Sequence, residues 1–126
     1  MVFYKPITDI EKIEELFPTI MLEDCSIYGA YMGYDEDDTF VGKALVKVNG
    51  YNCYLISVEC DFDDKLLVEG FVRAALNFSA NRSAYMAYCE LKMISDVLLN
   101  LGFEENRGIY SGDIPSLLKG SCSCCK

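Results

Sequence analysis

Three cysteines close to the C-terminus form the densest group of potential metal ligands in the sequence: Cys122, Cys124 and Cys125. Thiolates suit Zn²⁺ or Cu⁺, and a closed tetrahedral zinc site would take its fourth ligand from Cys60, Cys89 or another subunit. The spacing matches no standard zinc knuckle, so an oxidisable tail without a metal is favoured over a metal site. Because the sequence contains no histidine, His-containing zinc sites and His-dependent catalytic triads are excluded.

A second group of reactive side chains lies in the middle of the chain, where Glu59 and Cys60 end one predicted strand and Cys89 ends another. Glu59 could act through water as the general base that deprotonates an amine. A thiol at either strand end could accept an acyl group or carry out redox chemistry. The simpler interpretations, an exposed carboxylate in an acidic run and two small buried hydrophobic residues, are favoured at these positions.

The segment Lys65–Gly70 begins the clearest predicted helix and could bind an anion. Backbone N–H groups at a helix N-terminus attract phosphate together with the helix dipole, and glycine lets the backbone approach closely. Lys65 adds a cation, whereas Asp61, Asp63 and Asp64 lie directly upstream and repel phosphate. The alternative is a helix start that binds nothing.

The overall composition limits the classes of partner. The chain has 126 residues, the size of one domain, and 52% of them are hydrophobic, which is enough for a continuous core. A net charge of −9 argues against nucleic acid or an anionic membrane as the main partner, because both need clustered lysine and arginine. No apolar run approaches the length of a membrane span and the N-terminal residues do not resemble a signal peptide, so we expect a cytoplasmic protein.

The first half of the chain predicts one helix and an antiparallel meander. A short strand over Phe3–Pro6 is expected to stop at the proline, and Thr8 and Glu11 fit a capping box that opens a helix ending at Pro18. Asn49-Gly50 is a strong hairpin signal between the last two of three further strands. These strands are predicted at residues 26–34, 40–48 and 51–60.

The second half predicts a β-α-β unit. The helix over Lys65–Ala80 has a narrow polar stripe, so we expect it to be largely buried against a sheet. A strand over Ser83–Glu90 and a helix over Leu91–Leu101 follow, with Gly102 ending that helix. The remaining segments are an extended stretch at 103–113, interrupted by Arg107-Gly108, and one helical turn at 115–119.

This order predicts an α/β fold with a mixed sheet, antiparallel at first and parallel at its centre, and helices on both faces. The strands on either side of the Lys65 helix must be parallel, with a right-handed crossover between them. We expect one domain over residues 1–119 and a cysteine-rich tail over 120–126.

The region Tyr51–Phe103 resembles the GNAT superfamily of N-acetyltransferases, as a small and divergent member. Asn100-Leu101-Gly102-Phe103 is similar to the L-G-F ending of the family's fourth helix. The segment Lys65–Gly70 stands where the family has its pyrophosphate-binding loop, (Q/R)-x-x-G-x-(G/A). Lys65 replaces the usual Gln or Arg, Gly70 keeps the last small residue, and Val68 replaces the first glycine.

The resemblance implies a GNAT-like fold and acetyl-coenzyme A or coenzyme A as a substrate. The pantetheine arm would lie along the strand end, where the N–H near Cys60 would bind the thioester carbonyl. The residues implied for coenzyme binding are Val58, Glu59, Cys60, Lys65, Val68, Glu69, Gly70 and Phe71. The family's tyrosine general acid falls at Leu98 and its asparagine near Leu91, so Tyr85, Tyr88 or Tyr110 would have to supply a proton. Glu59 and Tyr110 are the candidate catalytic residues.

Two functions follow from the resemblance. The first is an acyl-coenzyme A-dependent N-acetyltransferase with an altered catalytic motif, whose acceptor is a small amine, such as a polyamine or an aminoglycoside, or a peptide. The second is a GNAT fold without catalysis that serves as an interaction or regulatory module, with a thiol or metal role for the terminal cysteines as an addition. A homodimer belongs to this second hypothesis, because the short C-terminal part is expected to lack a complete final hairpin and so to leave a sheet edge uncovered.

Overall fold

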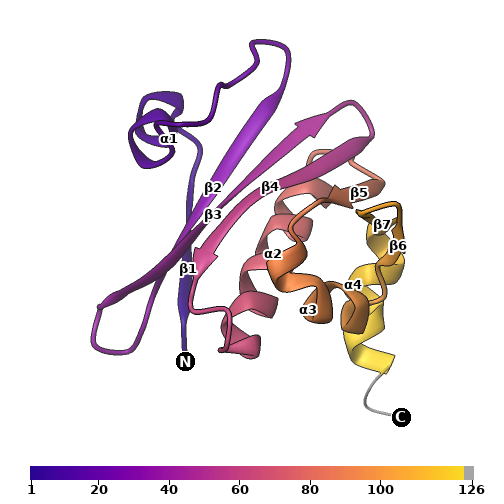
Figure 1. Cartoon of the computed structure of the whole chain (residues 1–126). Helices are drawn as coiled ribbons and strands as arrows, with labels where there is room; N and C mark the ends of the chain where they lie inside the picture. Colours follow the sequence, from indigo (N-terminus) through magenta and orange to yellow (C-terminus); the bar gives the residue numbers. More distant parts are fainter. Residues whose placement is uncertain (124–126) are drawn as a thin grey trace.

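Seven strands form one mixed sheet in the computed structural model, which describes residues 1–123 and the side chains of residues 1–119 (Figure 1). Their order in the sheet is β1-β2-β3-β4-β5-β7-β6. The first four pair antiparallel, β4 and β5 pair parallel, and β7 pairs antiparallel with both β5 and β6. The predicted mixed sheet is therefore confirmed. The strands are β1 (Phe3–Ile7), β2 (Ile27–Tyr34), β3 (Phe40–Asn49), β4 (Asn52–Cys60), β5 (Met86–Cys89), β6 (Glu104–Asn106) and β7 (Ile109–Asp113).

Helices cover both faces of this sheet, as the sequence predicts. On one face, Ile13 and Phe17 at α1 pack against Tyr28, Ala30 and Leu45. The other three helices lie on the opposite face and share the larger core (Figure 1). None of the helices within residues 1–123 is long and apolar enough to cross a membrane. The helices are α1 (Ile10–Leu16), α2 (Lys65–Ala80), α3 (Ser95–Leu101) and α4 (Ile114–Ser123), and a 3₁₀ turn, η1 (Lys92–Ile94), leads into α3.

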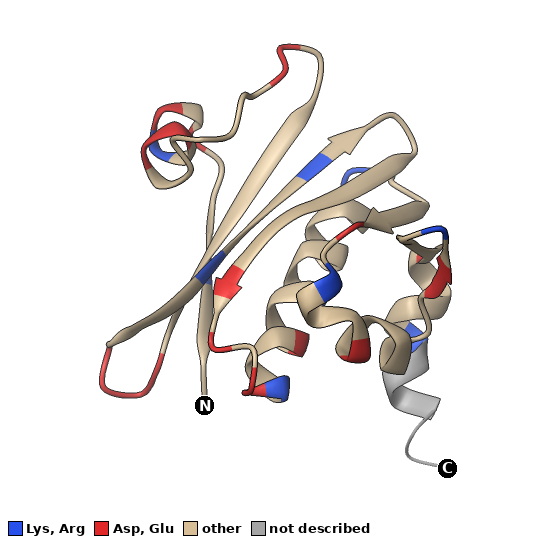
Figure 2. Cartoon of the chain, in the orientation of Figure 1, with Lys and Arg blue, Asp and Glu red and all other residues tan. Residues whose placement is uncertain are grey.

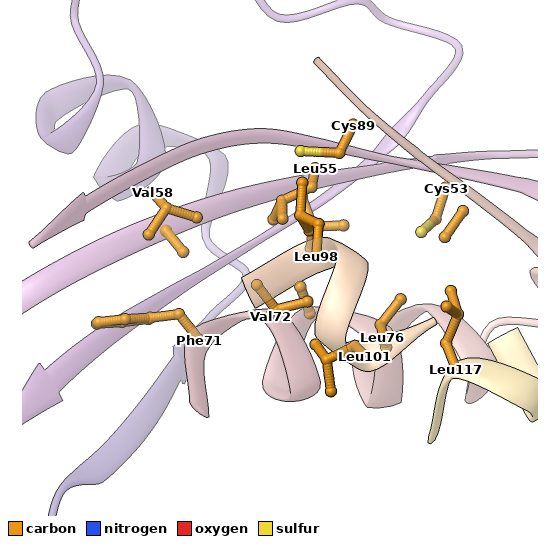
Figure 3. Packing of buried hydrophobic residues seen from close by; sticks show 14 of the residues in the cluster. Cys53, Leu55, Val58, Phe71, Val72, Leu76, Cys89, Leu98, Leu101 and Leu117 are labelled. Atoms are coloured by element: carbon orange, nitrogen blue, oxygen red, sulfur yellow. The ribbon is translucent and has the colours of Figure 1, made fainter. Parts of the chain in front are cut away.

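The central helix α2 has the predicted boundaries and forms the middle of the larger core. Its polar positions recur every four residues from Lys65, while Phe71 and Val72 are fully buried against the sheet (Figure 3). The ring of Phe78 lies directly on β2, because Gly29 has no side chain there: a Cβ at Gly29 would come within 2.4 Å of that ring. Burying a phenylalanine side chain stabilises a fold by about 1.5–3 kcal/mol. The buried rings of Phe71 and Phe78 therefore hold α2 firmly against the sheet.

Local details near the N-terminus differ from prediction. The N-cap of α1 is Asp9, whose side chain accepts a hydrogen bond from Glu11 N, so the predicted capping box at Thr8 is wrong. Pro6 does not stop β1, which continues to Ile7. Proline is tolerated there because β1 is an edge strand and does not need every N–H for pairing.

The C-terminal part contains a complete hairpin, which corrects the prediction that this hairpin was incomplete. Arg107 and Gly108 both have positive φ, 55° and 85°, and turn β6 back onto β7. This is the pattern of a two-residue type I′ turn, which matches the twist of paired strands. The uncovered edge that motivated a homodimer is therefore occupied by β6. The helix predicted over Leu91–Leu101 is divided into η1 and α3.

Candidate active site

The parallel strands β4 and β5 pair over a short length and then separate. Their contact runs from the pair Asn52 and Met86 to the pair Leu55 and Cys89, where β5 ends. β4 continues to Cys60 and keeps its antiparallel partner β3 throughout. The β5-facing edge of β4 beyond Leu55 is therefore not paired with β5, and its backbone groups on that side are available to a ligand.

A β-bulge accompanies this separation. Leu45 on β3 pairs with Ser57, whereas the next residue, Val46, pairs with Leu55, so Ile56 is an extra residue in β4. A bulge bends its strand and increases the local twist. After β5, Leu91 N donates a hydrogen bond back to Cys89 Sγ at 3.4 Å, which holds the chain as it leaves the sheet.

A pocket of about 250 Å³ lies at the point where the strands part. The rings of Tyr54 and Tyr88 are stacked in it, with centroids 5.5 Å apart and planes at 22°. The pocket therefore has an aromatic wall next to the unpaired edge of β4. Its lining residues come from β3, β4 and the end of β5: Lys47, Tyr54, Leu55, Ile56, Tyr88, Cys89, Glu90 and Leu91.

Two lysines of β3 connect this side of the sheet to α1 and the loop that follows it. Lys47 Nζ lies 3.1 Å from Glu23 Oε1 and 4.8 Å from the centre of the Tyr54 ring. The hydrogen bond from Lys47 lowers the pKa of Glu23. Lys43 Nζ donates to the carbonyl of Leu16 and lies 3.9 Å from Glu59 Oε1. Both lysine charges are thus engaged within the fold.

The N-terminus of α2 lies on the other side of the opening. Asp64 caps it by accepting a hydrogen bond from Leu67 N at 3.2 Å. Lys65 Nζ forms an ion pair of 2.5 Å with Asp96 Oδ2 of α3, which lowers the pKa of Asp96. Acidic residues gather at the end of β4 and in the loop before α2 (Figure 2). A second pocket of about 280 Å³ lies here, lined by Lys65, Glu69, Asp96, Val97 and Asn100.

Contacts within the protein core account for three of the residues implied for coenzyme binding, Val68, Gly70 and Phe71. Val68 and Phe71 are fully buried, so only their backbones could contact a ligand, and Val68 N already donates to Asp64 O at 3.1 Å. A Cβ at Gly70 would lie 1.8 Å from the hydroxyl oxygen of Tyr4, which donates to Leu67 O at 3.1 Å. Burial is the main cause that raises the pKa of Tyr4 to about 12. Gly70 therefore makes room for Tyr4.

Of the other implied residues, Glu69 lines the second pocket with Lys65, and the remaining three form the end of β4. Val58 is buried beneath α2, whereas Glu59 is exposed at the end of β4 and accepts a hydrogen bond from Ser57 Oγ at 3.4 Å. Cys60 ends the strand, and burial with nearby Asp61 and Asp64 raises the pKa of its thiol to about 11. The structure thus brings Glu59, Cys60 and Lys65 to one end of β4, and their role in coenzyme binding stays a prediction.

Cysteine nucleophiles are disfavoured by these surroundings. Burial also raises the pKa of Cys89 to about 11, against the smaller opposing effect of the Leu91 N–H. A neutral thiol is a poor nucleophile, so the simple interpretation of Cys60 and Cys89 as small apolar residues is supported. Within the part of the chain whose side chains are described, no three cysteine, aspartate or glutamate residues group as metal ligands. The predicted ligands Cys122, Cys124 and Cys125 lie outside that part.

The three tyrosine candidates for a proton donor lie in different surroundings. Tyr110 is buried in the larger core and pairs with Cys89 across β5 and β7. Tyr85 is 55% exposed and lies outside the pocket, whereas Tyr88 lines it. The sequence reasoning missed Tyr54. Both tyrosines were visible in the sequence, but only the parallel register shows that Tyr54 and Tyr88 are direct neighbours.

Comparisons with known proteins identify the fold. No family model matches the sequence, and no curated protein is similar to it. Solved structures are similar in shape at low sequence identity. One from Desulfovibrio desulfuricans, assigned to the GNAT family of acetyltransferases, has a TM-score of 0.66 and 10% identity, covering 90% of this chain and 99% of the other.

Two further structures show the range of acceptors that this fold serves. The ribosomal-protein-S18-alanine N-acetyltransferase of Escherichia coli has a TM-score of 0.65 and 10% identity, with 90% of this chain and 94% of that one covered. Spermidine N-acetyltransferase from Vibrio cholerae, in complex with CoA and spermine, has a TM-score of 0.61 and 12% identity, covering 87% and 78%. The chain therefore has the GNAT fold that the sequence resemblance implied.

Proposed function

We propose that this chain, with its GNAT fold, is an N-acetyltransferase that moves an acetyl group from acetyl-coenzyme A to a small amine. The observation that carries the proposal is the separation of β4 from β5 after Leu55 and Cys89, next to the N-terminus of α2. Proteins with the same fold acetylate amines, and one of them was solved with coenzyme A bound. The free cysteines among the described residues agree with a reducing compartment such as the cytoplasm.

The unpaired edge of β4 supplies the binding groups for the coenzyme. The arm of the coenzyme adds to this edge between Ile56 and Cys60, where backbone N–H and C=O groups can bind its amides. A backbone N–H at the Ile56 end of this edge, beside the pocket, binds the thioester oxygen, on which negative charge develops during the reaction, whereas Cys60 lies at the diphosphate end of the arm. Lys65 and the first N–H groups of α2 then face the diphosphate.

The reaction is direct transfer. The neutral amine nitrogen attacks the thioester carbonyl carbon, a C–N bond forms, and the C–S bond breaks. The nitrogen loses a proton, which Glu59 takes through water, and the departing thiolate of coenzyme A gains one. Tyr88, at the pocket wall, is better placed than Tyr110 to donate that proton.

Calorimetric titration with coenzyme A and acetyl-coenzyme A tests the binding step. Saturable binding below millimolar concentration is expected, and absence of binding at millimolar ligand contradicts the proposal. Release of free thiol in the presence of amines tests transfer. Replacement Glu59→Gln should reduce kcat by about 10²–10⁴-fold if Glu59 is the base. Glu14→Gln, an exposed carboxylate on α1, is the matched control and should leave kcat unchanged.

One observation favours the second candidate, a GNAT fold that serves as an interaction or regulatory module. The Lys65–Asp96 ion pair and the acidic loop before α2 place negative charge where a diphosphate would bind. In addition, the position of the family's tyrosine is occupied by the fully buried Leu98. A folded protein that binds no coenzyme A at millimolar ligand would support this alternative.

A further inference from the structure

The pocket where β4 and β5 part has walls suited to a flat apolar group. Tyr54 and Tyr88 stack at 5.5 Å, and Leu55, Ile56 and Leu91 complete the apolar part of the lining. Aromatic rings attract one another in stacked or edge-to-face arrangements beyond the gain from buried area. A ligand with its own ring would therefore gain more from this wall than an aliphatic chain of similar size.

The charges of the pocket suit a single ammonium group. Lys47 and Glu90 are its only charged lining residues among those described, and Lys47 is engaged by Glu23 at 3.1 Å. No lysine or arginine in the described part of the chain lies within ion-pair distance of Glu90. Glu59 lies outside this lining and faces Lys43 at 3.9 Å. Glu90 is thus an exposed carboxylate without an ion-pair partner among the described residues, and one such carboxylate matches one cation, whereas a polyamine would need several.

The size of the pocket favours a small molecule over a peptide. Its volume of about 250 Å³ is below the range of about 300–1,000 Å³ that is typical of sites for drug-sized ligands. A compact acceptor with one ring and one amine can bury itself there, because the aromatic wall and the carboxylate lie in the same pocket.

We propose that the acceptor is a primary monoamine that carries an aromatic ring. The ring packs against Tyr88 and the edge of Tyr54, whose two faces are covered by Lys47 and Tyr88. The ammonium group pairs with Glu90 before it loses its proton. This assignment rests on the proposed transfer reaction and names the class of amine that it uses. The binding of the amine can nevertheless be measured without turnover.

The first experiment compares three amines by the shifts of backbone amide signals of Tyr54, Ile56, Tyr88 and Glu90. The probes are phenethylamine, hexylamine and putrescine, each titrated with and without coenzyme A. Phenethylamine should bind about threefold to tenfold more tightly than hexylamine, which has the same charge but no ring. Putrescine should bind more weakly than phenethylamine. Equal binding of phenethylamine and hexylamine, or tighter binding of putrescine, overturns the assignment.

Variants of the two tyrosines and of Glu90 then test separately the contact with the aromatic ring and the contact with the ammonium group. Tyr88→Leu should weaken phenethylamine by about threefold to tenfold and leave hexylamine nearly unchanged, and Tyr54→Leu is a second variant with the same expectation. Tyr85→Leu, at an exposed tyrosine outside the pocket, is the matched control. Glu90→Gln should weaken both monoamines, while Glu14→Gln should weaken neither. If the Tyr88→Leu and Tyr54→Leu proteins are folded and keep the preference for phenethylamine, the assignment is wrong.

Titration with coenzyme A in the same samples distinguishes this inference from the proposed function. Binding of phenethylamine at these residues without any binding of coenzyme A would contradict the transfer reaction and leave the pocket assignment standing. Binding of coenzyme A without a preference for the aromatic amine would contradict the acceptor class alone.

Discussion

The two sides of the opening between β4 and β5 differ in charge and in the way they are built. On the α1 side, the pocket wall is made of tyrosine and aliphatic side chains, and Lys47 is neutralised by Glu23. On the other side, the entrance to α2 is rich in aspartate and has one cation, Lys65, which is held by Asp96 (Figure 2). The proposed acceptor side thus offers its ligand mainly side chains, whereas the proposed coenzyme side offers mainly backbone groups.

The strongest test of this difference concerns Gly70 and Tyr4. Gly70→Ala should lower the free energy of unfolding by about 1–3 kcal/mol, because the added Cβ meets the Tyr4 hydroxyl and overpacks the site. In a Tyr4→Ala background, the same replacement should cost much less. Denaturant unfolding of the four proteins gives the coupling energy. Equal costs in both backgrounds would mean that Gly70 is not kept small by Tyr4.

A smaller effect is expected at the floor of the acceptor pocket. The folded-state pKa of Cys89 is raised from 9.0 to about 11, so the folded protein holds this proton more tightly than the unfolded chain. The resulting stabilisation is complete below pH 9 and is lost as pH rises through about 11. Unfolding measured between pH 8 and 11 should show this decline, and Cys89→Ala should make it shallower. An unchanged slope in the variant would rule out Cys89 as its source.

The smallest effect concerns the ion pair at the coenzyme side. Asp96→Asn should strengthen coenzyme A binding up to about fivefold, because it frees Lys65 and removes a negative charge at an exposed site. Lys65→Gln should weaken binding by a similar factor, and both effects should shrink as salt is added. Calorimetry at two ionic strengths measures the dissociation constant of coenzyme A for each variant, and Glu15→Gln on α1 is the control. Weaker binding to the Asp96→Asn protein would mean that Asp96 serves the ligand rather than competing with it.

Regular patterns in the sequence were enough to predict the first five strands of the sheet and its central helix. The boundaries of α2 follow from its four-residue polar stripe, and the parallel pairing of β4 and β5 follows from the helix between them. The same holds for Gly102, which ends α3 with φ of 115°. Each of these features depends on local periodicity or on a single residue with a special conformation.

The candidate site was harder to predict because it depends on contacts between distant residues. Tyr4 lies far from Gly70 in the sequence, and nothing near Gly70 indicates that a ring from β1 fills the space above it. The stack of Tyr54 on Tyr88 depends on which residues of β4 and β5 are paired. The helix between the two strands predicts that they are parallel, but it does not predict this register to within one residue. Arg107 gave no hairpin signal, because a non-glycine residue with positive φ is uncommon.

The bulge at Ile56 has a consequence for how such an opening can be gained or lost. Ser57 and the residues after it are displaced by one backbone unit relative to β3, while Val58 still faces the core. We expect that deleting Ile56 alone would restore a regular ladder and leave the other side chains of β4 on their present faces. We therefore expect the width of the opening to depend on this one inserted residue, a change that no single substitution along the strand reproduces.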